Sequence, residues 1–107
     1  MGRQPFIAIT LYEFSSDAEG YQPLYREDVS LIYAESEEEA RAVTAARFRS
    51  EAGTYKNEAG NNITVSPKEI VDVASALVDD LSEDCDLYAR HFRDFAAYSK
   101  MEPLLGD

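Results

Sequence analysis

The hydrophobic pattern begins with a segment, residues 6–14, that is rich in β-branched and aromatic side chains and contains neither Gly nor Pro. This composition is typical of a β-strand. Its apolar side chains occupy both alternation sets, as in a strand that is central in its sheet or covered on both faces. Turn-forming residues separate it from a second predicted strand, residues 24–34, in which Val29, Leu31 and Tyr33 share one face. We expect the two strands to form an antiparallel hairpin.

A helix is predicted to follow the second strand. Ser36 is a candidate N-cap, and Glu39 lies three positions later, at the spacing of a capping box. Residues 37–52 contain five alanines and no Gly or Pro, and Gly53 is expected to end the helix as its C′ residue. We expect Ala42, Val43 and Ala46 to share the buried stripe, and Arg41, Arg47 and Arg49 to remain in solvent.

The second half of the chain is less regular. A hairpin tip is expected at residues 60–62, after a short edge strand at 54–56. Beyond Pro67, which is expected to interrupt the pattern, residues 69–78 fit a strand or a helix, and we favour the strand. Residues 86–92 alternate like another strand. Asp94 can cap a short final helix, FAAYSKM, that stops before Pro103.

The order of these elements predicts an α+β fold. We expect an antiparallel β-sheet of four to five strands, with one long helix packed on one face and a short C-terminal helix. The length of 107 residues fits one domain over residues 1–107.

The net charge is the global property of the sequence that most restricts the possible binding partners. The chain has 21 acidic and 10 basic residues, which gives a net charge of −11. Such a surface repels phosphate backbones and anionic lipids, so we expect neither nucleic-acid nor membrane binding. The start of the chain lacks the apolar region of a secretory signal. The single cysteine, Cys85, excludes an intramolecular disulfide and favours a reducing, cytoplasmic location.

The acidic residues are concentrated in two blocks, residues 13–39 and 79–107, around a nearly neutral middle, and each block contains one dense group. One group, Glu35 and residues 37–39, is largely explained by helix capping and the helix dipole. The other group, the five carboxylates within residues 79–86, has three possible explanations: a divalent-cation loop, a surface for a basic partner, or a solvated turn. It lacks the ligand spacing of an EF-hand loop, so we expect no metal. The predicted partner-binding residues are Asp79, Asp80, Glu83, Asp84, Asp86 and Glu35.

Catalytic motifs are missing from the sequence. A Cys85–His91 nucleophile pair would lie at opposite ends of the predicted strand at 86–92, too far apart to act together. The glycines are too dispersed to cradle a phosphate, and no P-loop or nucleophile elbow occurs. We therefore expect no catalytic residues and no cofactor.

Three stretches of the chain together resemble the bacterial domain of unknown function 4288 family. They are the β-rich opening, residues 35–64 with "SEEEA" and "YKNEAG", and residues 87–103 with a Tyr-x-Arg-x-Phe pattern. The resemblance implies a shared fold and a bacterial cytosolic protein. The family has no assigned activity, so the resemblance implies no catalytic residue.

The sequence leaves three functional hypotheses open. The first is a non-catalytic module that binds a basic protein, in its sharpest form an immunity or inhibitor protein against a bacterial toxin. The second is a homo-oligomeric structural module, for example a homodimer that pairs through the segment 86–92 and buries Tyr88 and Phe92. The third is a small ligand-binding protein or enzyme that uses the sheet face, with Arg90 and His91 near the site.

Overall fold

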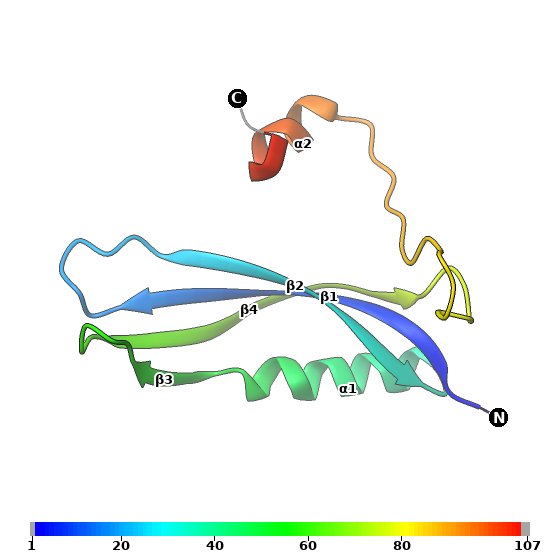
Figure 1. Cartoon of the computed structure of the whole chain (residues 1–107), viewed down its shortest axis with the longest axis horizontal. Coiled ribbons are helices and arrows are strands. Elements are labelled where there is room, and N and C mark those ends of the chain that lie inside the picture. The colour runs from blue at the N-terminus through cyan, green and yellow to red at the C-terminus, as the bar shows by residue number, and fades with distance from the viewer. Residues whose placement is uncertain (1, 106–107) are drawn as a thin grey trace.

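Four antiparallel strands form a twisted sheet, shown in Figure 1. The computed structural model describes residues 2–105. The strands are β1 (Gln4–Ser16), β2 (Leu24–Ala34), β3 (Gly53–Lys56) and β4 (Asn62–Ser75), in the order β2-β1-β4-β3. The helix α1 (Glu37–Ser50) lies along one face, and α2 (Phe95–Met101) is followed by a 3₁₀ turn, η1 (Pro103–Leu105). This is the predicted α+β fold with a long and a short helix.

Strand β1 is central, as its two-sided apolar pattern predicts. It pairs with β2 from Gln4↔Ala34 to Phe14↔Leu24, which confirms the hairpin, and with β4 on its other side. Its residues from Pro5 to Thr10 are all buried. The even-numbered side chains of β1 face α1, and the odd-numbered ones face the opposite side of the sheet, which we call the far face.

The core lies between the sheet and α1. Its buried cluster brings three strands and the helix together, and consists of Phe6, Ala8, Ile32, Ala34, Ala40 and Val73. The predicted stripe on α1 is wrong, because Ala42, Val43 and Ala46 are exposed. The helix instead buries Ala40 and Thr44, and Phe48 continues this row to reach the ring of Tyr12 at 5.5 Å between centroids. Alanine occurs on several sides of this helix, so the sequence pattern does not single out one apolar side. The side that is buried is determined by packing against the sheet.

The start of α1 confirms the predicted cap, and its end differs. The Ser36 Oγ accepts a hydrogen bond from the Glu39 amide at 3.1 Å, and the Glu39 carboxylate accepts one from the Glu35 amide at 2.7 Å. Gly53 is not the C′ residue. The helix ends at Ser50 with Glu51 as its C-cap in a right-handed conformation, and Gly53 already begins β3.

Strand β4 confirms the preferred interpretation of residues 69–78 in its main part, since the strand extends to Ser75. Pro67, however, does not interrupt it. A register shift against β1 between Leu11 and Tyr12 lies beside Pro67, and such a bulge accommodates a residue that cannot donate a ladder hydrogen bond. The short edge strand and the hairpin tip at Gly60, which has a positive φ of 87°, are as expected.

The strand predicted at residues 86–92 is not formed. Residues 76–94 contain neither helix nor strand. The Leu77 amide donates to the Leu87 carbonyl at 3.1 Å, and the Tyr88 hydroxyl donates to the Asp72 carboxylate. An alternating pattern becomes a strand only where a sheet edge pairs with it, and this segment makes no ladder. The final helix is correct, because the Asp94 side chain caps α2 at the Ala97 amide.

The core predicts the effect of one truncation. Val73→Ala, at a side chain that is 2% exposed against α1, should lower the free energy of unfolding by about 2 kcal/mol, through lost burial and a residual cavity. The matched control Val43→Ala, on the open side of α1, should change it by less than about 0.5 kcal/mol. Urea denaturation of both variants measures the difference, and equal effects would contradict this placement of the core.

Candidate functional site

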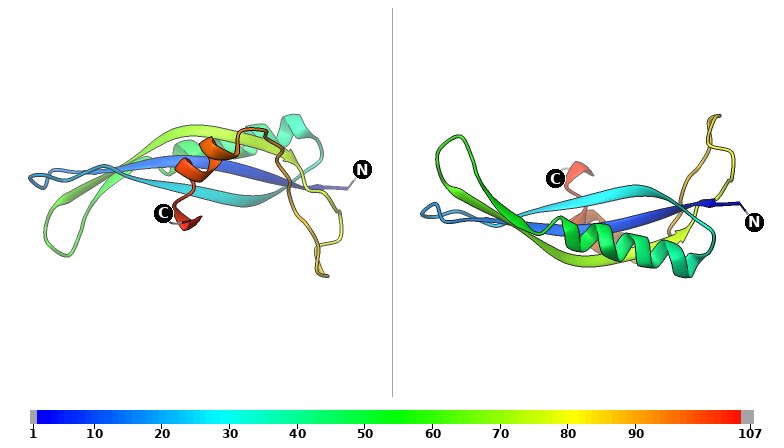
Figure 2. Two further views of the ribbon diagram at one scale, coloured as in Figure 1. Left: turned by 90° about the horizontal axis from the view of Figure 1, so that it is seen from above. Right: turned by 90° about the horizontal axis from the view of Figure 1, so that it is seen from below.

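The two acidic groups leave the sheet at the same end. Ala34, the last residue of β2, pairs with Gln4, and Ser75, the last residue of β4, pairs with Phe6. The acidic start of α1 follows β2, and the acidic segment 79–86 follows β4, so both lie near the start of β1 (Figure 1). In Figure 2 the segment 79–86 projects to the side of the sheet opposite the start of α1, so the groups form two patches at one end of the sheet, which we together call the acidic end. It comprises Glu35, Glu37, Glu38, Glu39, Asp79, Asp80, Glu83, Asp84 and Asp86.

Most of these carboxylates are exposed and lack a basic partner. Glu37 forms an ion pair with Arg41 at 3.0 Å, and within residues 2–105 the others form none. Hydrogen bonds from the side chain and the amide of Ser82 lower the pKa of Asp80, which keeps this carboxyl ionised. The acidic end is therefore exposed to solvent and strongly negative, and such a surface favours the approach of positively charged molecules.

The acidic end does not assemble a metal site. Across the part of the chain that the structure describes, no three His, Cys, Asp or Glu side chains are grouped so as to hold an ion. Cys85 is exposed within the acidic segment.

All six predicted partner-binding residues lie at the acidic end. The sequence identified them as a dense cluster plus Glu35. It did not show that the two groups share one end, because this depends on where β2 and β4 stop relative to β1.

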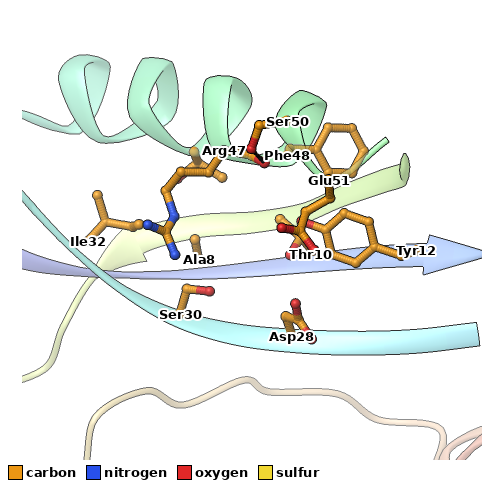
Figure 3. Close-up of a pocket in the computed structure, with 11 residues that line it drawn as sticks. Ala8, Thr10, Tyr12, Asp28, Ser30, Ile32, Arg47, Phe48, Ser50 and Glu51 are labelled. Carbon is orange, nitrogen blue, oxygen red and sulfur yellow. Dashed lines mark hydrogen bonds between the residues drawn. The ribbon is translucent and has the colours of Figure 1, made fainter. Parts of the chain in front are cut away.

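A second feature, a polar cleft between α1 and the sheet, was not predicted. Its volume is about 200 Å³, and it opens to solvent beside the helix (Figure 3). The lining residues come from β1, β2 and α1 with its C-cap: Ala8, Thr10, Tyr12, Asp28, Ser30, Ile32, Thr44, Arg47, Phe48, Ser50 and Glu51. The sequence signal was the polar face of β2, with Asp28 and Ser30 opposite its apolar residues.

Two side chains of α1 give the cleft its chemistry. Thr44 is 2% exposed, and its Oγ1 has no hydrogen-bond partner among the described residues. Arg47 extends its guanidinium from the helix toward Ala8 and Ser30, as Figure 3 shows. It forms no ion pair within residues 2–105. The cleft thus combines a positive charge with hydroxyl groups in a small space.

Arg26 neutralises the acidic side of the cleft. It forms ion pairs with Asp28 at 2.9 Å and Glu51 at 3.0 Å, although the Asp28 contact of its Nε lacks hydrogen-bond geometry. Its guanidinium also lies 4.9 Å from the centroid of the Tyr12 ring and 5.1 Å from that of Phe14. Burial opposes its charge, but the hydrogen bond to Glu51 and the charge of Asp28 raise the pKa of Arg26. The contact also ties the end of α1 to β2.

The unpartnered hydroxyl predicts a stabilising substitution. Thr44→Val keeps the shape of the side chain and removes a buried polar atom, so it should raise the free energy of unfolding by about 1 kcal/mol. Thr44→Ser keeps the hydroxyl and loses a methyl group, and should lower it. Thermal unfolding of the two variants checks this, and a loss of stability in Thr44→Val would show that the hydroxyl is satisfied.

Comparison with known proteins gives a family and no activity. No curated protein and no solved structure matches the chain significantly. No helix among residues 2–105 is long and apolar enough to cross a membrane. The family match covers nearly the whole sheet, α1 and all of the acidic segment, and it ends before α2, so most of the Tyr-x-Arg-x-Phe stretch lies beyond it. With its model matching residues 5–89, the chain belongs to the family described as Domain of unknown function (DUF4288).

Proposed function

We propose that this chain is a non-catalytic protein-binding module whose acidic end binds a basic surface of another protein. The observation that carries the proposal is the convergence of two acidic groups, far apart in the sequence, at one end of the sheet. Only Glu37 among them has a basic partner within the described residues. A field of this kind speeds the encounter with a positively charged protein and makes it sensitive to salt.

A more specific form of the proposal is an immunity or inhibitor protein that neutralises a basic bacterial toxin in the cytoplasm. The support is the small size, the net charge of −11 and the lack of a recognisable catalytic motif in the sequence. The single cysteine is consistent with a reducing compartment. An inhibitor of a nuclease meets a surface built to bind phosphates, and exposed carboxylates are its natural complement.

The polar cleft supports a second candidate function, the binding of a small anion. The support is the Arg47 guanidinium directed into the cleft beside the unpartnered Thr44 hydroxyl. A volume of about 200 Å³ is enough for a phosphate or a short carboxylate. This candidate places the ligand beneath α1, whereas Arg90 and His91, the residues expected for a ligand site, lie with the C-terminal helix.

The acidic end can be tested with two matched double variants. Glu35→Gln/Glu83→Gln removes two charges at the acidic end, and Glu19→Gln/Glu58→Gln removes two from the turns at the other end of the sheet. We expect the first pair to weaken capture of a basic protein from a bacterial extract at about 0.05 M NaCl, and the second pair to leave it unchanged.

The captured protein is then used to measure association kinetics. Its association rate with the wild-type chain should fall at least about tenfold between about 0.05 and 0.5 M NaCl, because the Debye length shortens. A rate that does not respond to salt, or equal effects of the two double variants, would refute the acidic end as the binding surface.

The anion candidate has a separate measurement. Inorganic phosphate should raise the thermal midpoint of the wild-type chain by specific binding, and Arg47→Gln should lose most of this increase. Arg49→Gln, which changes the same charge on the same helix outside the cleft, is the control for general salt effects. Equal responses of the three proteins would eliminate the cleft as an anion site.

A further inference from the structure

The chain exposes more surface than a compact protein of its mass. Its accessible surface is 8074 Å², whereas a compact monomer of 12.0 kDa exposes about 6,000 Å². Its radius of gyration is 17.0 Å, against about 13 Å for a compact chain of this length. An excess of about 2,000 Å² exceeds the roughly 800 Å² that each partner of a stable complex buries.

One part of this excess is the far face of β2. Val29, Leu31 and Tyr33, which share that face, are 64%, 45% and 44% exposed. The polar side chains of the same strand, Asp28 and Ser30, point to the opposite side and line the cleft under α1. The strand therefore presents its apolar side away from α1, the one helix in the described part of the chain that covers the sheet. An exposed row of apolar side chains on a strand whose other side is polar indicates that a further element or a partner packs on the apolar side.

The other part is the C-terminal arm, residues 89–105. Among the described elements α2 packs only against η1 and reaches no strand. The arm nevertheless carries a row of apolar side chains that are mostly exposed: Phe92, Phe95, Tyr98, Met101, Leu104 and Leu105. Phe92 and Tyr98 stack at 4.8 Å and enclose an apolar groove with Met101. A seven-residue helix is too short to be stable in water by itself, so it needs a surface on which to dock.

The arm leaves the sheet at a fixed point. The hydrogen bond from Tyr88 to Asp72, together with that between Leu77 and Leu87, ties the preceding segment to the end of β4. Beyond it the chain runs away from the sheet on the side opposite α1, as Figures 1 and 2 show. The apolar arm therefore projects on the same side as the far face, whose β1 part, with Ile7 and Ile9, is already buried and whose β2 part is exposed. The helix α2 contacts no strand.

The arm and the far face also have complementary charge. Residues 89–105 hold Arg90, Arg93 and Lys100 against two acids, in a chain that is otherwise strongly acidic. On the far face, Glu27 and Glu69 flank Leu11 from the two neighbouring strands, and neither forms an ion pair within the described residues. The far face also carries Arg3, 5.8 Å from the centroid of the Tyr33 ring, and Lys68, which is paired with Glu13. The charge of the basic arm is therefore complementary to the part of the face around Leu11.

We propose that two copies of this chain form a dimer by exchanging their C-terminal arms, so that α2 of each copy docks on the far face of the other. A second copy satisfies both surfaces at once. The arm of the second copy covers the far face of the first, and the far face of the second copy binds the arm of the first. Such reciprocal contacts close into a two-fold dimer and leave no unpaired patch. Large aromatic and aliphatic side chains at the arm and the face provide the buried area that a stable dimer needs. The acidic end is not used, so the proposal is independent of the proposed function.

Two variants separate the surfaces. Leu31→Glu places a charge on the far face and leaves the arm intact, and Phe95→Glu does the reverse. Light scattering should give the wild type twice the mass of 12.0 kDa, and each variant the mass of a monomer. Val43→Glu, an exposed position on α1, is the control and should remain a dimer. Circular dichroism should show all four proteins folded, because each position is exposed.

Mixing the two variants tests the exchange itself. Leu31→Glu supplies a good arm and Phe95→Glu a good far face, so an equimolar mixture should recover dimers with one intact contact, at weaker affinity than the wild type. A wild-type monomer would overturn the proposal, including the case in which the arm docks on its own sheet. A Phe95→Glu protein that dimerises like the wild type would also overturn it, because the two far faces would then stack without the arms.

Discussion

The structure depends on the pairing of β1 with two antiparallel neighbours. Because β1 is hydrogen-bonded to β2 on one side and β4 on the other, its backbone is paired on both edges and its apolar side chains can be buried on both faces. The helix α1 then needs only small residues to lie close to the sheet. Ala40 is completely buried against this surface. Every other feature is placed relative to this central strand.

The same pairing decides where the charge is located. β2 and β4 both run antiparallel to β1 and end beside its first residues, so the segments that follow them emerge together. Acidic groups separated by some 40 positions in the sequence thus lie at the same end of the sheet, one on each side of it (Figure 2). The register also brings the polar side of β2 under α1, which creates the cleft and leaves the apolar side of that strand uncovered.

The sequence predicted the elements that have strong local signals. The apolar run of β1, the Ser36 cap and the Asp94 cap are such signals, and each is confirmed. The failures share a different cause. Ala42 and Val43 were expected to be buried, and Ala40 is buried instead, because a local pattern does not determine which side of an alanine-rich helix contacts the sheet. Residues 86–92 alternate like a strand, but strand formation requires a partner edge, which a local pattern does not contain.

The site shows the same division between local and tertiary information. The six predicted partner-binding residues could be named from their density, but the cleft could not, since Thr44 and Ser30 become neighbours only when α1 lies on β2. An arm-exchanged dimer would extend this logic to a second chain. Its two acidic ends would be held in one particle, so a basic partner with two copies of its own site would bind both by linked equilibria and gain avidity without new contacts. The uncovered face and the acidic end would then serve one purpose, the presentation of two negative surfaces at a fixed separation.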